Sequence, residues 1–92
     1  MNLYIVIVGY KDIDTFSEDY LNGIFSNLGK YVRLKELVYL LRSDASAVDI
    51  RDTLVQEDTD ITNIFVANCA SPSAWRGMDS TNDEIKSILR NG

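Results

Sequence analysis

Asp12 and Asp14 have the residue types and spacing that most directly suggest chemistry, since two carboxylates follow the first apolar stretch of the chain. Mg²⁺ prefers oxygen ligands and often needs only one or two carboxylates from a protein. Such an ion would orient a water molecule and offset charge on a phosphoryl oxygen. A structural explanation requires less, because acids near the start of a helix are favourable and an Asp-x-Asp pair is common.

Other catalytic groups are missing from the sequence. The chain has no histidine, which excludes Ser-His and Cys-His nucleophile pairs and the usual zinc chemistry. Cys69 is the single cysteine, so it forms no internal disulfide, and we interpret it as a small core residue. Neither of the glycine patterns GxGxxG and GxxxxGK is present, which makes a nucleotide-binding enzyme a poor interpretation.

The charge balance disfavours nucleic acid as the main partner. There are 14 acidic and 9 basic residues, for a net charge of −5, whereas phosphate-binding proteins are usually basic. A local group of basic residues, Arg33, Lys35 and Arg42, is the candidate phosphate-binding surface. The alternative is that these are ordinary solvated strand edges. Arg51 and Asp52 are explained by local ion pairing on an exposed helix face.

The first half of the chain predicts a strand, a helix and a second strand. Residues 3–8 are continuously apolar and rich in β-branched side chains, which is typical of a strand covered on both faces. Thr15 and Glu18 have capping-box spacing, so we expect a helix to start near Thr15, and Gly29 to end it in a left-handed cap. Residues 31–35 alternate between apolar and polar, which predicts an edge strand with Arg33 and Lys35 on one face.

The second half of the chain again predicts a strand, a helix and a strand. Residues 37–41 form an apolar run that suits a central strand, and Asp44 or Ser46 can cap the helix that follows. Ile50 and Leu54 lie on the inner face of that helix, with Val48 or Val55 at its flank. Residues 61–69 return as a strand.

A last short helix is predicted near the C-terminus. Ser80 and Thr81 each precede an acid by three residues, and the inward-facing side chains are Ile85, Ile88 and Leu89. The predicted fold is therefore α+β: a ferredoxin-like βαββαβ domain with a four-stranded antiparallel sheet, two helices on one face and a short C-terminal helix. Residues 1–92 form one domain, with a core over 1–70 and a tail over 71–92. We expect the tail or a second copy to cover the other face of the sheet.

Two sequence segments carry a family resemblance. They are LLRSDASAVDIRDTL and, after a polar loop, NIFVANCASPSAWRGM. Both resemble SinR-like small bacterial proteins, which are related to the CRISPR-associated Cas-two family. The resemblance covers the second half of the chain closely and the first half by the order of elements. Its most specific residues are Asp44, Ser46, Ile50, Arg51, Asp52, Phe65, Val66, Trp75 and Gly77.

This resemblance implies a ferredoxin-like homodimer whose interface includes Phe65, Val66, Trp75 and Gly77. It also implies metal-dependent nuclease activity, supported by an acidic residue at the end of the first strand of each subunit. In this sequence that position falls on or near Gly9 or Tyr10. Trp75 also has a simpler interpretation, that it caps the end of the core, and either explanation fits a dimer.

Our leading hypothesis is a non-catalytic, homodimeric interaction module that contacts another protein in the cytoplasm, needs no cofactor and belongs to a bacterial or phage defence or toxin-related system. The alternative is an endonuclease that uses Mg²⁺ or Mn²⁺ bound by Asp12 or Asp14, with Arg33, Lys35 and Arg42 holding phosphates. A small-molecule regulatory domain is a third interpretation, for which the sequence has no positive signal. No apolar run approaches the roughly 18 residues of a membrane span, so we expect no membrane association.

Overall fold

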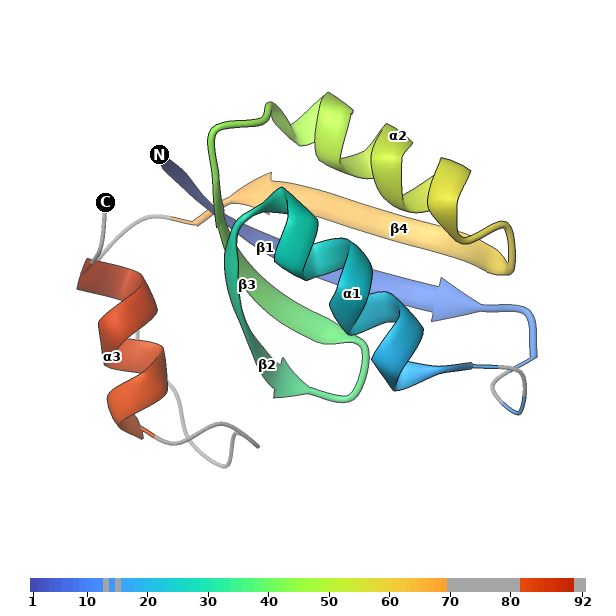
Figure 1. Cartoon of the computed structure of the whole chain (residues 1–92), viewed down its shortest axis with the longest axis horizontal. Helices are drawn as coiled ribbons and strands as arrows, with labels where there is room; N and C mark the ends of the chain where they lie inside the picture. Colours follow the sequence, from blue (N-terminus) through green and yellow to red (C-terminus); the bar gives the residue numbers. More distant parts are fainter. Residues whose placement is uncertain (13, 15, 70–81, 91–92) are drawn as a thin grey trace.

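The chain folds into one sheet and three helices, as seen in a computed structural model that describes residues 1–12, 14, 16–69 and 82–90 (Figure 1). The predicted α+β class with a four-stranded antiparallel sheet is confirmed. No helix within these residues is long and apolar enough to cross a membrane. In chain order the elements are β1 (Asn2–Tyr10), α1 (Glu18–Leu28), β2 (Lys30–Lys35), β3 (Val38–Ser43), α2 (Ala47–Glu57), β4 (Ile61–Asn68) and α3 (Asn82–Arg90).

The sheet has the strand order β2-β3-β1-β4, so β1 and β3 are central and the other two strands are edges. Every neighbouring pair is antiparallel. The prediction that the two unbroken apolar runs occupy the centre is therefore confirmed. β1 pairs with β3 and β4, and β3 also pairs with β2, so the two central strands together set the register of the sheet.

One face of the sheet builds the main core with α1 and α2. Alternate residues of a strand point to opposite faces, and Tyr4, Val6 and Val8 of β1 all lie on this face. They pack with Leu21 and Phe25 of α1, and with two buried residues of α2, Ile50 and Leu54. The predicted inner face of α2 is confirmed, as is its Ser46 cap, whose hydroxyl accepts from the Asp49 N–H at 3.1 Å.

The opposite face is covered by α3 at one end only. Leu3 of β1 packs there with two neighbours in the sheet, Val32 and Leu40, and with Ile85 and Ile88 of α3. The predicted inward stripe of the last helix is confirmed. At the other end Ile7 keeps 42% of its surface exposed, so the expectation that β1 is covered on both faces holds only for its first half.

Helix α1 begins later than the sequence suggested. Its N-cap is Ser17, whose side chain accepts from the Tyr20 N–H at 3.3 Å. Thr15, the predicted cap, lies outside the described residues. Phe16 precedes the helix instead of joining its apolar stripe, and its ring packs against that of Tyr10 with centroids 5.1 Å apart.

Two turns also differ from expectation. Gly29 ends α1 with φ 161° and ψ −158°, which is extended backbone and not the predicted left-handed cap. The residue that adopts left-handed geometry is Leu37, with φ 63°, at the turn between β2 and β3. A leucine with this geometry is uncommon.

Gly29 is required because two backbone segments meet closely. A Cβ atom at this position would lie 1.9 Å from the carbonyl oxygen of Arg42, whereas a Cβ at Gly23 would meet nothing within 4 Å. Only a glycine therefore lets the end of α1 pass beside the end of β3.

These two glycines form a matched pair for mutagenesis. We expect Gly29→Ala to lower the free energy of unfolding by about 3 kcal/mol, because a backbone atom must move to admit the methyl group. Gly23→Ala should raise it by roughly 0.5–1 kcal/mol, because alanine is the better residue inside a helix. Urea denaturation followed by circular dichroism measures both, and equal effects would contradict the close approach.

Candidate interaction surface

The start of β4 is positioned by a buried carboxylate, Asp58, which is 8% exposed. The hydroxyl of Tyr10 donates to one carboxylate oxygen at 2.6 Å, and the N–H of Asp60 donates to the other at 3.2 Å. The backbone N–H of Asp58 also donates to the carbonyl of Leu54, and its carbonyl accepts from Ile61. One residue thus joins the end of α2, the end of β1 and the first residue of β4.

Tyr10 and Tyr39 keep their hydroxyl protons to unusually high pH. Burial raises the pKa of Tyr10, and the hydrogen bond to Asp58 raises it further. Burial also raises the pKa of Tyr39 to about 12, with a smaller contribution from the charge of Glu18. Tyr39 is fully buried and stacks on Phe25 with ring centroids 4.3 Å apart. Both groups are structural, because each hydroxyl serves the packing of the helices on the sheet.

An exposed apolar row crosses the sheet face that α3 leaves open. Val38, Ile7 and Phe65 are direct partners across β3, β1 and β4, and directly opposed residues of antiparallel strands share a face. Phe65 is 58% exposed and Ile7 is 42% exposed, whereas Val38 is half-buried. We call these three residues the open row.

The four predicted interface residues do not share one surface. Phe65 belongs to the open row, but Val66 points to the opposite face and packs against the core under the helices. Trp75 and Gly77 lie outside the described residues. The side chain of Phe65 is therefore the part of that prediction that the structure places on an exposed surface.

The predicted metal ligands lie in an exposed loop after β1. A carboxylate oxygen of Asp12 accepts from the N–H of Asp14 at 3.0 Å, which is the hydrogen bond of a tight turn. Asp12 also lines a shallow hollow together with Lys11 and Asp60. Within residues 1–12, 14, 16–69 and 82–90, no group of three or more His, Cys, Asp or Glu residues is arranged to hold a metal ion. The observed role of this pair is the turn.

The predicted phosphate-binding residues are divided between the two faces of the sheet. A β-bulge between Arg33 and Lys35 shifts the register, so Arg33 pairs with Tyr39 and Lys35 pairs with Val38. Arg33 lies on the helix-covered face and forms an ion pair with Glu18 at 3.0 Å. Lys35 lies at the exposed end of β2 on the other face. The prediction that these two side chains share a face is wrong, because the bulge interrupts the alternation.

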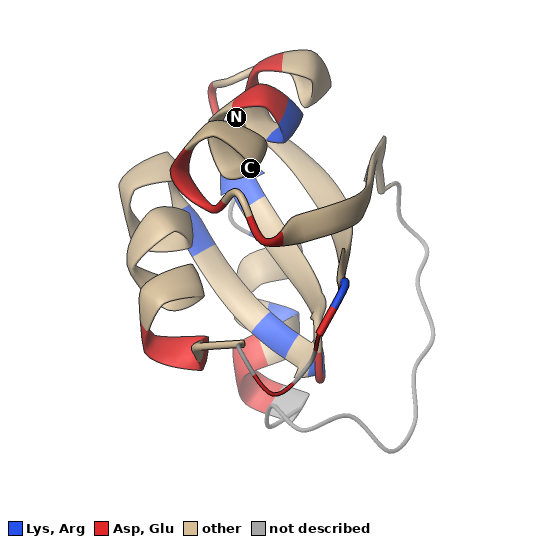
Figure 2. Ribbon diagram, turned by 90° about the vertical axis from the view of Figure 1, so that its right-hand side faces the viewer, with Lys and Arg blue, Asp and Glu red and all other residues tan. Residues whose placement is uncertain are grey.

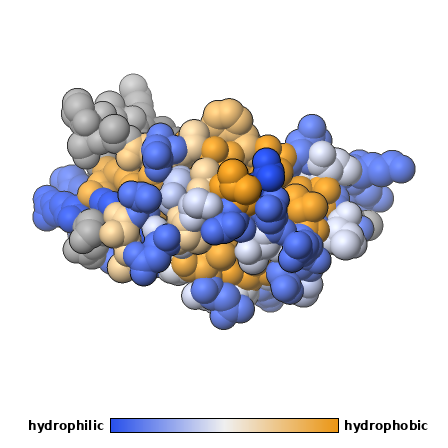
Figure 3. Space-filling model, turned by 90° about the horizontal axis from the view of Figure 1, so that it is seen from above, coloured by the Kyte–Doolittle hydropathy of each residue, from blue (hydrophilic) through white to orange (hydrophobic). Residues whose placement is uncertain are grey.

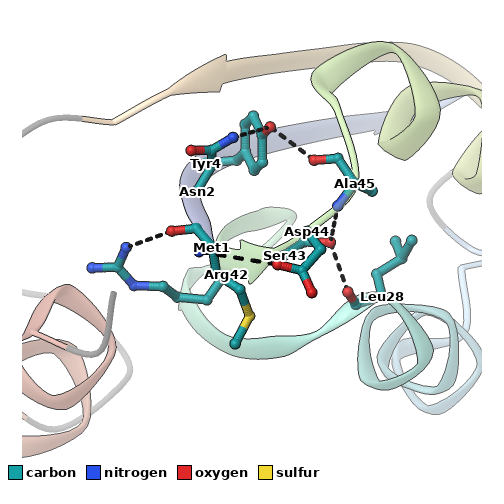
Figure 4. Close-up of polar contacts among 8 residues, drawn as sticks. All are labelled: Met1, Asn2, Tyr4, Leu28, Arg42, Ser43, Asp44 and Ala45. Atoms are coloured by element: carbon teal, nitrogen blue, oxygen red, sulfur yellow. Dashed lines mark hydrogen bonds and ion pairs between the residues drawn. The ribbon is translucent and has the colours of Figure 1, made fainter.

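Arg42 is not part of any phosphate-binding surface, because only 9% of it is exposed. Its guanidinium donates to the carbonyls of Ile88 at 2.7 Å and Leu89 at 2.5 Å, which are in the last turn of α3. A third bond, at 3.5 Å, reaches the carbonyl of Met1 (Figure 4). A cation at the C-terminal end of a helix satisfies free carbonyl groups there and is favoured by the helix dipole. Arg42 therefore fixes α3 to the sheet.

The neighbouring Ser43 also has a structural role that sequence reasoning missed. Its buried hydroxyl donates to the carbonyl of Leu28 at 2.7 Å and accepts from the N–H of Ala45 at 3.1 Å (Figure 4). Close by, the hydroxyl of Tyr4 donates to the carbonyl of Ala45 at 2.8 Å. Ser43 and Tyr4 thus hold the segment that leads from β3 into α2.

The fold and these surfaces define a small α+β domain with a half-covered antiparallel sheet. No protein-family model, curated protein or solved structure matches this chain.

The two tyrosine pKa shifts predict a loss of stability at alkaline pH. A raised pKa in the folded state means that the unfolded chain loses its tyrosine protons first, near pH 10.0. The stability is therefore complete below pH 10 and falls as the pH rises through the folded-state value. We expect Tyr39 to account for roughly 1–2 kcal/mol of this fall after solvent screening of the charge.

Urea denaturation at several pH values from neutral to pH 12 measures the effect. Tyr39→Phe should flatten the profile above pH 10, because its ring no longer ionises. A fall that is equally steep in this variant would show that other groups cause the alkaline loss.

Proposed function

We propose that this protein is a non-catalytic interaction module that works as a homodimer and contacts another protein in that form. The single observation that supports this proposal is the open row. A phenylalanine and an isoleucine lie side by side on an exposed sheet face, although the same chain buries comparable side chains under α3 a few residues away. A second copy that pairs beside Phe65 would remove the most exposed ring of the open row from water, and the other protein would cover the rest of the row.

The ferredoxin-like arrangement is part of the same proposal. Its support is the order of elements, in which two strand-helix-strand units follow each other, and the central position of β1 and β3. The packing of both α1 and α2 on one face adds to that support. The defence or toxin-related setting and the cytoplasmic location stay predictions from sequence.

The endonuclease alternative gains no observation in its favour. Its proposed metal ligands hold a turn, Arg33 is engaged by Glu18, and Arg42 binds carbonyl groups of the chain itself. A nuclease site would need its acidic residues close together, whereas in Figure 2 the acidic residues are spread over helix ends and loops around the molecule.

The dimer is tested by the molar mass in solution. We expect light scattering at tens of micromolar protein to give twice the mass of the chain, and Phe65→Asp to give the monomer mass, because the carboxylate would be buried in the interface. Asn27→Asp is the matched control, since it adds the same charge at an exposed position of α1 and should leave the dimer intact. A monomeric wild-type protein would refute the proposal.

The non-catalytic part is tested with labelled RNA and with single- and double-stranded DNA. We expect these substrates to remain intact in Mg²⁺ or Mn²⁺ as they do in EDTA. Cleavage that needs the metal and disappears in Asp12→Ala/Asp14→Ala would replace our proposal with the endonuclease alternative.

A further inference from the structure

The outer edge of β4 carries none of the charges and prolines that usually keep an edge strand from pairing with another strand. β4 ends the sheet, and its sequence ITNIFVAN contains neither a charged residue nor a proline. The other edge strand, β2, carries Lys30, Arg33 and Lys35. Natural proteins use charges of this kind to keep edges from pairing, so an uncharged edge of this length marks a pairing surface.

The backbone groups available at this edge follow from the register. The N–H of Cys69 donates to the carbonyl of Leu3, and these residues continue the register of β1 with β4. Hydrogen-bonded and non-hydrogen-bonded pairs alternate along an antiparallel ladder. From Asn63 to Cys69, beyond the irregularity at Gly9 and Tyr10, the odd-numbered residues therefore bond to β1. The even-numbered residues between them, with Ile64 and Val66 at the centre, direct their N–H and C=O groups outward.

Helix α2 adds an apolar flank beside this edge. Val48 is 53% exposed and Val55 is 41% exposed, although both are on the helix that covers β4. With 3.6 residues per turn they fall on one flank, with Arg51 between them. Figure 3 looks onto the side of the molecule that carries α2 and β4 and shows hydrophobic side chains exposed there among hydrophilic ones.

The α2 flank is complementary to its own copy. If the α2 helix of a second copy lies antiparallel beside α2 of the first, Val48 faces the partner's Val55, and Arg51 faces the partner's Asp52. Arg51 and Asp52 already attract each other within one chain, with 2.9 Å between Nη2 and Oδ1, so the same charges can pair across the axis. This symmetry in apolar and charged positions identifies a second copy as the occupant, because a two-fold interface must be self-complementary.

We propose that β4 pairs antiparallel with β4 of a second copy about a two-fold axis at Phe65, which joins the two sheets into one. This inference rests on the proposed homodimer and specifies its geometry. Ile64 then pairs with the partner's Val66 through outward backbone groups, and Phe65 faces the partner's Phe65 on the open side of the sheet. Aromatic cross-strand pairs of this kind stabilise a sheet.

The position of the axis follows from both elements. An axis at Phe65 places the two most exposed rings directly opposite each other in a non-hydrogen-bonded pair, where side chains approach most closely. An axis at Ile64 or Val66 would separate them along the strands. Figure 1 shows α2 lying along β4, so the middle of the helix is beside the middle of the strand.

Cysteine cross-linking tests this register. In a Cys69→Ser background, the axis at Phe65 places residue 63 opposite the partner's residue 67. We expect an oxidised mixture of Asn63→Cys and Ala67→Cys proteins to form a disulfide-linked dimer, and each protein alone to form much less. Phe65→Cys should link to its own copy. The mixture retains Phe65, so the test does not depend on removing the ring that we place at the axis.

The possible failures are distinguishable. A background protein that is monomeric by light scattering would refute the homodimer itself, and with it this inference. A background protein that is dimeric, but whose 63 and 67 cysteines link no better in the mixture than alone, would overturn the β4 register and leave the homodimer standing. Self-linking by Asn63→Cys would equally contradict an axis at Phe65.

Discussion

The alternation of side chains along β1 is the constraint on which the rest of the structure depends. β1 is one of the two central strands, it pairs with β3 and β4, and its successive residues must face opposite ways. Tyr4, Val6 and Val8 create a core that two helices cover. Leu3, Ile5 and Ile7 create a second apolar face, on which α3 packs within the residues that the structure describes.

That helix covers one end of the second face because polar contacts fix its position. Arg42 projects from β3 on that face and binds the last carbonyls of α3, while Lys30 donates to the hydroxyl of Ser87 at 2.9 Å. With α3 anchored over Leu3 and Leu40, the open row stays uncovered. The guanidinium is buried because three carbonyl oxygens satisfy it, which is the condition under which a charge is tolerated inside a protein.

The main polar contacts within the described residues hold elements of the fold together. The strongest polar arrangement, Tyr10 with Asp58, is used to set where β4 begins, and the other notable hydroxyls hold the junction between β3 and α2. The two sheet edges differ in charge: β2 carries basic residues and β4 carries no charged residue. A domain that protects one edge and leaves the other open is suited to association through a single strand.

Local sequence pattern determined the order of strands and helices, the central position of the two apolar strands, the Ser46 cap and the inward face of α3. Each of these depends on residues within about one or two turns or strand lengths of each other, so periodicity and capping chemistry suffice. The predicted start of α1 was too early, because Ser17 caps the helix although other residues nearby can also act as caps.

Only the tertiary structure decided which residues face the same surface. The bulge in β2 separates Arg33 from Lys35, and the ends of α3 and β1 bury Arg42. The packing of the helices puts Val66 on the covered face of the sheet and leaves Phe65 on the open one. Each outcome depends on the register of one strand against another or on a contact between segments far apart in the chain. A shift of one residue in register moves every side chain of a strand to the other face, and local sequence does not encode that shift.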